Sequence, residues 1–332
     1  MKKNILVLGG AGFIGSYMVR ELLKQKDVKI TIIDNFSKYG VIHHDFFDDP
    51  RVEVKVRDVR VMYPSEFKGY DLVICLAALI GGIQYFHKIP YQIARDNNEI
   101  LAYAIDRTLT ASPEALFVYT SSSMVYERVQ TPVTEEDTYN QMIPFTNYGM
   151  QKLYGEYLVR GAHQEFGLKY LIIRPFNAVG SGELPEMNRK GEVEFGMAHV
   201  IPDFVYRSLV KQTPFEMLGD GKQVRTFTHA KDIAEAFVLT LEKEIINEDF
   251  NFCGLNTYNV MDLAQLIWKK VNSNVPFPEV RHHPAPEADV RYRVGKSEKA
   301  KRLLGWTPRY DMDYVIDDTL GFIRKNLIKI KS

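Results

Sequence analysis

The chain has 332 residues, of which 45% are hydrophobic and 25% are charged, a composition typical of globular proteins with one large or two modest domains. Lysine plus arginine and aspartate plus glutamate number 42 each, so no overall field draws the chain to nucleic acid or to an anionic membrane. Cys75 and Cys253 lie in apolar sequence without CxxC spacing, which predicts buried reduced thiols and a cytoplasmic protein.

The first 34 residues have the layout of a dinucleotide site. An apolar run over residues 5–8 passes directly into a glycine-rich turn, and a second run over residues 30–33 ends at Asp34. The first glycine allows a tight turn, the second lets the backbone approach a pyrophosphate, and the third lets the following helix pack closely. The N-terminus of that helix offers free N–H groups to the phosphates. These glycines are Gly9, Gly12 and Gly15.

Asp34 indicates which dinucleotide binds. A carboxylate at this position accepts hydrogen bonds from the ribose hydroxyls and repels a 2′-phosphate. Residues 35–38 contain no arginine, and Lys38 is the one feature that favours the phosphate. The sequence therefore predicts NAD rather than NADP.

Apolar runs continue to alternate with helix-length segments, at residues 52–56, 72–76, 116–119 and 170–173. Continuous apolar strands of this kind predict a parallel sheet covered on both faces. The longest apolar run, 72–83, is too short to span a membrane and suits a buried strand.

From about residue 179 the regular alternation of apolar runs and helix-length segments ends. Residues 181–194 predict a long surface loop, and apolar residues at helical spacing follow near residues 263–271 and 312–327. We therefore expect an α/β protein, a Rossmann-type doubly wound parallel sheet with a smaller mixed α/β substrate-binding domain. The expected division is 1–178 with 227–258 for the first domain, and 179–226 with 259–330 for the second.

Tyr148 and Lys152 are four residues apart, which in a helix places them on one face, with Glu156 one turn further. An ammonium near a phenol favours the phenolate and lowers its pKa from about 10, which suits an acid/base. Four hydroxyl residues, 120–123, follow a buried strand, where ligands of parallel sheets bind. An ordinary exposed pair of residues four apart, and a polar strand end or a helix N-cap, are the alternatives that these patterns leave open.

In their order along the chain, these motifs resemble the extended short-chain dehydrogenase/reductases, in the nucleotide-sugar epimerase and dehydratase branch, closest to UDP-glucose/galactose 4-epimerase-like members. The resemblance covers nearly the whole chain. Its motifs are GGAGFIGS, Asp34, Asp58, Leu76-Ala77-Ala78, Asn98, SSSMVY, YxxxK, RPFNAVG at 174–180, GDGKQVRTF at 219–227 and LLGWTP at 303–308.

The resemblance implies a role for each matching residue. It implies that Tyr148 is the catalytic acid/base, that Ser122 is the catalytic Ser/Thr beside it, and that Lys152 binds the nicotinamide ribose. The residues implied in NAD binding are Gly9, Gly12, Phe13, Ile14, Gly15, Asp34, Asn35, Asp58, Val59, Leu76, Ala77, Ala78, Asn98, Tyr148, Lys152 and Phe176. Those implied in nucleotide-sugar binding are Ser122, Ser123, Asn177, His199, Val200, Glu216, Arg225 and Arg291.

Departures from the family pattern narrow the reaction. Dehydratases carry an Asp-Glu pair where Ser123 and Met124 stand, decarboxylases a glutamate at the Met124 position, and some epimerases a cysteine nearby. The remaining Ser/Tyr/Lys set implies C4 epimerisation through a 4-keto intermediate. A nucleotide-sugar dehydrogenase or reductase, a C2 epimerase, and a non-enzymatic NAD-binding regulator are the alternatives.

Other departures concern the substrate site. Residues 286–289 replace the family's Arg-x-Gly-Asp, which leaves Arg291 as the candidate second phosphate contact. Glu127 replaces a glycine, and the unusual segment 79–87 is expected to shape the sugar pocket.

A wide apolar stripe over residues 91–108, together with the Tyr148 helix, predicts a two-fold homodimer, the assembly common in the family. The stripe is formed by Ile93, Ile100, Leu101, Ala104 and Ile105. The adjacent histidine pairs 43–44 and 282–283 are interpreted as loop or surface residues, and no metal site is expected.

Overall fold

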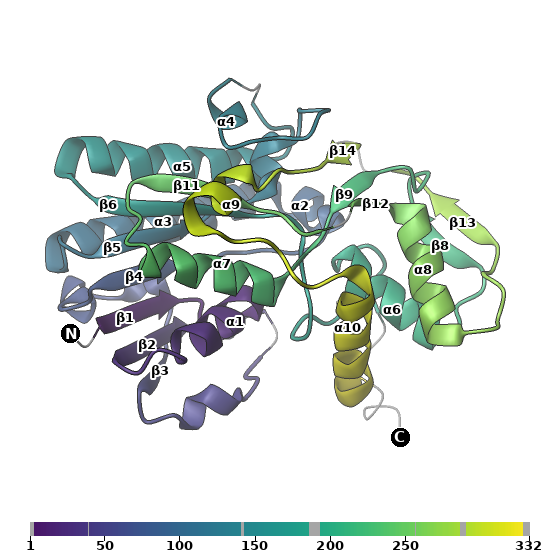
Figure 1. Cartoon of the computed structure of the whole chain (residues 1–332), viewed down its shortest axis with the longest axis horizontal. Helices are drawn as coiled ribbons and strands as arrows, with labels where there is room; N and C mark the ends of the chain where they lie inside the picture. Colours follow the sequence, from purple (N-terminus) through teal and green to yellow (C-terminus); the bar gives the residue numbers. More distant parts are fainter. Residues whose placement is uncertain are drawn as a thin grey trace.

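The computed structural model describes residues 3–38, 40–140, 143–185, 193–255, 257–285 and 290–327. Figure 1 shows a large lobe built on one sheet and a smaller lobe of short strands and helices beside it. None of the described helices is both long and apolar enough to cross a membrane.

Seven parallel strands form the central sheet, in the order β11-β6-β5-β4-β1-β2-β3. From β1 the chain adds β2 and β3 on one side, and from β4 it adds β5, β6 and β11 on the other. This reversal between β1 and β4 creates the crevice where ligands of doubly wound sheets bind. This confirms the predicted fold class. The strands are β1 (Lys3–Leu8), β2 (Val28–Asp34), β3 (Val52–Val56), β4 (Leu72–Cys75), β5 (Leu116–Thr120), β6 (Lys169–Pro175) and β11 (Glu248–Phe252).

Helices cover both faces of the sheet because successive strand residues point to opposite sides. Ile5 and Val7 pack in a core with α1, α7 and α9, whereas Leu6 and Leu8 pack with α3 and α5 on the other face. These helices are α1 (Phe13–Leu22), α3 (Pro90–Ala111), α5 (Asn147–Phe166), α7 (Ala230–Glu242) and α9 (Glu298–Leu304).

The smaller lobe has its own apolar core around α6 (Val200–Leu209), α8 (Val260–Asn272) and α10 (Met312–Leu327). The last two helices contain the residues predicted from helical spacing. Short sheets complete the lobe and its junction with the large one. Their strands are β7 (Ala178–Val179), β8 (Phe215–Leu218), β9 (Val224–Thr226), β10 (Thr228–His229), β12 (Thr257–Asn259), β13 (Val280–His283) and β14 (Tyr292–Arg293).

Two local predictions were wrong. The apolar run 72–83 is a strand only as far as Cys75, because Gly81 and Gly82 turn the chain into the short helix α2 (Ile83–Lys88). The segment 181–194 is not simply a surface loop, because Glu183 is buried; residues 186–192 lie outside the described residues. One further short helix, α4 (Asp137–Asn140), precedes α5 along the chain.

Candidate active site

A cavity of about 420 Å³ opens at the carboxyl ends of the strands, between the two lobes. It brings together most of the residues implied by the sequence motifs. Those that line it are Gly9, Gly12, Phe13, Ile14, Gly15, Asp34, Asn35, Asp58, Val59, Leu76, Ala77, Ala78, Ser122, Ser123, Tyr148, Lys152, Asn177, His199, Val200, Glu216 and Arg225.

The glycine-rich turn forms one end of the cavity. Helix α1 starts after Gly12 with no side-chain cap and no acidic residue in its first turn, so its terminal N–H groups remain available to an anion. A Cβ on Gly15 would lie 2.3 Å from the Gly9 carbonyl oxygen, so this close approach requires glycine. Asp34 accepts hydrogen bonds from the backbone N–H of Ala11 at 3.1 Å and of Phe36 at 2.9 Å.

Two buried polar atoms near this half of the cavity lack a protein partner. They are the Asn98 side-chain oxygen on α3 and the Thr120 hydroxyl at the end of β5. Asn98 itself does not line the cavity. Because unpartnered buried polar groups are costly, the hydroxyl of Thr120, which does line the cavity, fits a site completed by a bound polar molecule.

The three residues predicted to react, Ser122, Tyr148 and Lys152, all line the cavity. Tyr148 and Lys152 lie in the first turns of α5, and Ser122 follows β5 with its hydroxyl within hydrogen-bonding reach of the Tyr148 phenol. The Lys152 ammonium donates to the Thr120 carbonyl oxygen at 2.8 Å and lies 5.7 Å from the Tyr148 ring centroid. A phenol with a hydroxyl partner and a nearby ammonium can donate and accept one proton.

Burial dominates the titration of these groups. It raises the pKa of Tyr148 above its usual range, while the Ser122 hydrogen bond and the charge of Arg293 act to lower that pKa. Burial also lowers the pKa of Lys152 to about 8. The expectation that the Lys152 ammonium lowers the Tyr148 pKa was therefore wrong, because burial outweighs the groups that lower it, and the charge that acts in that direction is Arg293, which is far away in the sequence.

The segment 79–87 forms the wall next to Tyr148, and Ile80, Ile83 and Phe86 line the cavity. The Phe86 ring on α2 stacks on the Tyr148 ring, with centroids 4.3 Å apart and an angle of 6° between the planes. This wall excludes water from one face of the phenol, which is consistent with the raised pKa.

Glu127 anchors the start of α5. It accepts hydrogen bonds from the Thr146 backbone N–H at 2.8 Å and from the Thr146 hydroxyl at 2.5 Å. Thr146 in turn caps the helix by accepting from the Gly149 N–H at 2.9 Å. The glutamate that replaces the family's glycine therefore fixes the helix terminus from which Tyr148 projects.

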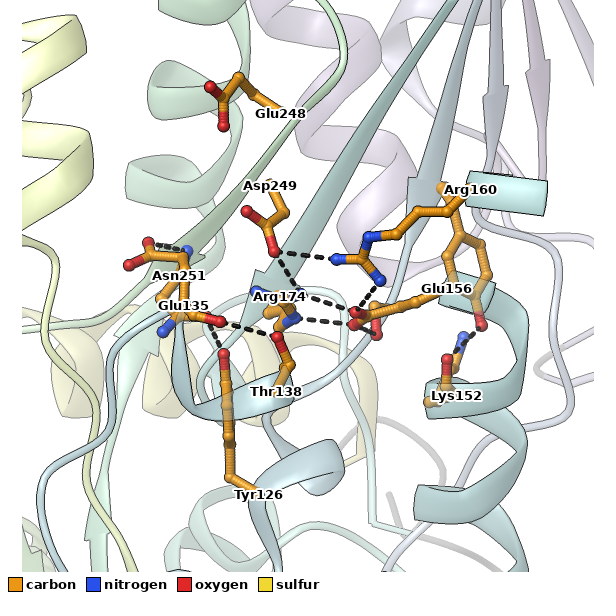
Figure 2. Close-up of polar contacts among 12 residues, drawn as sticks. Tyr126, Glu135, Thr138, Lys152, Glu156, Arg160, Arg174, Glu248, Asp249 and Asn251 are labelled. Atoms are coloured by element: carbon orange, nitrogen blue, oxygen red, sulfur yellow. Dashed lines mark hydrogen bonds and ion pairs between the residues drawn. The ribbon is translucent and has the colours of Figure 1, made fainter. Parts of the chain in front are cut away.

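A buried ionic network holds α5 against the sheet one turn beyond Lys152 (Figure 2). Glu156 accepts from the Ser121 hydroxyl at 2.6 Å and from Arg174 at 2.6 and 2.7 Å. Arg174 also donates to Asp249 at 2.6 Å, and Arg160 donates to the same carboxylate at 3.0 Å. Because Ser121 precedes Ser122, this network aligns the end of β5 with α5.

Two further residues implied by the sequence lie outside the cavity lining. Phe176 is fully buried and packs on Tyr126, with ring centroids 6.0 Å apart. Arg291 donates to Asp220 with both distances at 2.9 Å. Arg293, which sequence analysis did not identify, lines the cavity instead. The sequence places Arg291 and Arg293 two residues apart on one short segment, which could have suggested an arginine in the cavity. It did not show which of the two faces the cavity.

The match to known proteins agrees with this geometry. The model of the NAD dependent epimerase/dehydratase family matches residues 5–253. The chain belongs to this family. Members of the NAD-dependent epimerase/dehydratase family are enzymes of nucleotide-sugar chemistry, and NAD is the cofactor. The free helix terminus, the glycine turn and the unpartnered Thr120 hydroxyl fit that cofactor.

Individual relatives differ in their reactions. A UDP-N-acetyl-alpha-D-glucosaminuronate decarboxylase of Bacillus cytotoxicus is 27% identical over 98% of this chain and 99% of its own. A UDP-glucose 4-epimerase of Halalkalibacterium halodurans is 28% identical over 92% and 91%. The crystal structure of UDP-glucose 4-epimerase from Thermotoga maritima, with UDP-glucose, has a TM-score of 0.81 at 25% identity over 98% and 99%.

Proposed function

We propose that the protein is an NAD-dependent nucleotide-sugar epimerase acting at C4. The observation that carries the proposal is the Ser122, Tyr148 and Lys152 set in the cavity lining. Glu127 and Cys75, which act on Tyr148 and Lys152 through space, both lie outside that lining. Ser123 and Met124 follow Ser122, and both buried cysteines lie outside the cavity lining. The relatives named for UDP-sugars make uridine nucleotides the first substrates to test.

Carboxylates on other parts of the cavity wall are already engaged. Glu183 pairs with His199, and Asp203 accepts from Arg207 at 2.9 Å. Glu216 faces Arg207 at 3.6 Å. Elimination of water or loss of CO₂ needs an added acid or base at the sugar, so these pairs support a reaction that moves one proton and one hydride.

Each residue then has a defined task. Tyr148 takes the proton of the C4 hydroxyl and later returns it. The Ser122 hydroxyl forms hydrogen bonds with the Tyr148 phenol oxygen and with the C4 oxygen of the sugar. Lys152 is positioned to bind the nicotinamide ribose. Bound NAD supplies the hydride acceptor and a positive charge that favours the phenolate. The 4-keto sugar turns in the pocket, and the alcohol is restored on the other face. The buried thiols also support a cytoplasmic setting.

Tyr148→Phe tests this proposal. It should keep NAD and nucleotide-sugar binding while slowing turnover by about 10²-fold or more, the usual scale for a lost acid/base. Ser122→Ala should do less harm. Tyr154→Phe, an exposed tyrosine on the same helix, is the matched control and should be neutral.

Product analysis separates the competing reactions. Wild-type protein is incubated in heavy water with UDP-, GDP- and dTDP-sugars and examined by NMR and by absorbance of NADH. We expect inversion at C4 with no net NADH. Stoichiometric NADH would identify a dehydrogenase, inversion at C2 the other epimerase, and deuterium fixed on a ring carbon would rule out hydride return.

A further inference from the structure

The cavity holds two arginines side by side. Strands β9 and β14 are parallel neighbours, and their register pairs Arg225 with Arg293. Residues paired in register point to the same face of a sheet, and both of these line the cavity. Arg225 also donates to the Val224 carbonyl oxygen at 2.9 Å and to that of Val290. The two guanidinium groups have different partners, so each can contact a different part of the ligand.

The contacts of Arg293 are unusually poor for a cation. One of its terminal nitrogens donates to the Asn177 side-chain oxygen, and the other contacts the Met124 sulfur, a weak acceptor. Its Nε is buried and has no hydrogen-bond partner. Burial lowers the pKa of Arg293 to about 10, and Glu127 acts on its charge through space. Among the described residues, no carboxylate forms an ion pair with it.

A buried guanidinium without an ion-pair partner is costly, so the site calls for an anion from the ligand. Carboxylate is a good match, because a guanidinium can donate two parallel N–H bonds to it. Arg293 lines the cavity, and each of its terminal nitrogens carries a second N–H besides the one directed at Asn177 or Met124.

The position of Arg293 indicates which part of the ligand carries the anion. Its charge acts on the Tyr148 phenol, and it contacts Met124, whose N–H donates to the Ser122 hydroxyl at 3.2 Å. It therefore lies at the reacting end of the sugar. The carbon adjacent to C4 is C5, which bears the C6 substituent. The diphosphate is attached to C1, across the ring.

We propose that Arg293 binds a carboxylate at C6 of the sugar, so that the substrate is a nucleoside diphosphate hexuronate. This rests on the proposed C4 epimerisation, which places the C4 carbon at Tyr148. Arg225, which also lines the cavity, is assigned to the diphosphate by the sequence resemblance.

Binding measurements test the proposal separately from turnover. NAD-loaded full-length protein is titrated by calorimetry with matched hexose and hexuronate pairs on UDP, GDP and dTDP, which differ only at C6. We expect the hexuronate to bind at least tenfold more tightly than its hexose. Arg293→Gln should abolish this preference and leave hexose affinity within about twofold, while Arg293→Lys should keep part of it.

Two further variants complete the test. Arg309→Gln, which removes an exposed arginine paired with Glu235 outside the cavity lining, should keep the full preference. Arg225→Gln should weaken both members of a pair equally. If Arg293→Gln also weakened both equally, Arg293 would contact the diphosphate and the proposal would be overturned. A wild-type preference for the hexose would overturn it without any variant. Failure of every nucleotide sugar to bind would instead remove the proposed function.

Discussion

At the scale of single residues, Asp249 gives the network behind the catalytic helix a defined pH dependence. Burial raises its pKa, but Arg174 and Lys299 outweigh that effect and hold the pKa at about 2, below the usual range of an aspartate carboxyl. A depressed carboxyl pKa stabilises the fold above the unfolded value, and this stabilisation is lost as the pH falls toward 2. Its size is about 2 kcal/mol.

Asp249→Asn should therefore lower the free energy of unfolding most at neutral pH, and the difference from wild type should shrink as the pH falls below about 4. Urea unfolding across that range measures it. Asp313→Asn, an exposed residue, is the control and should show a small difference throughout. A difference between wild type and Asp249→Asn that stays constant down to pH 2 would contradict the assignment.

Residues within one local motif could be predicted from the sequence, but the inward arginine could not. Tyr148, Lys152 and the glycine turn depend on spacings of a few residues, which helix and turn geometry fix. Arg291 and Arg293 are the same residue type and lie two positions apart, so local sequence does not distinguish them. Their difference arises from the pairing of β14 with β9, almost 70 residues earlier, and from the Asp220 carboxylate that engages Arg291.

At the scale of elements, the turn between β1 and α1 depends on a close approach that only glycine permits. Gly15→Ala would place a Cβ 2.3 Å from the Gly9 carbonyl oxygen, so the turn must open. We expect weakened NAD binding, by tenfold or more in calorimetry, and a lower melting temperature. Gly161→Ala, in α5 with no atom within 4 Å of the added Cβ, should instead be neutral or stabilise by up to about 1 kcal/mol. Equal NAD affinities for the two variants would refute this role of Gly15.

The sheet elements were predictable because fully buried strands need continuous apolar sequence, whereas the start of α2 was not. Residues 79–83 are as apolar as the strand before them. Gly82 precedes the first residue of α2 and donates its N–H to the Met197 carbonyl oxygen at 2.8 Å, a contact with the other lobe that local patterns do not encode. That contact places Phe86 on the Tyr148 ring.

At the scale of the whole molecule, the apolar stripe on α3 does not support the predicted homodimer, and exposed side chains on α5 are the better candidate for an interface. The stripe on α3 is buried in its own chain: Ile93, Leu101 and Ala104 are at most 1% exposed because they pack within the large lobe. Its width therefore reflects internal packing. The exposed apolar side chains lie instead on α5, which packs against α3, where Met150, Tyr154 and Tyr157 are 44%, 51% and 57% exposed.

We expect these α5 side chains to pack against their two-fold mates, because one row of large apolar residues on a helix surface is self-complementary about a dyad. Light scattering at micromolar concentration should then give a dimer for the wild type. Tyr154→Glu combined with Tyr157→Glu should give a folded monomer, since four carboxylates would be brought together at the dyad. Tyr63→Glu, at an exposed tyrosine 69% accessible in the large lobe, should leave the dimer intact. A monomeric wild type, or a dimer that survives the double substitution, would show that α5 is not the interface.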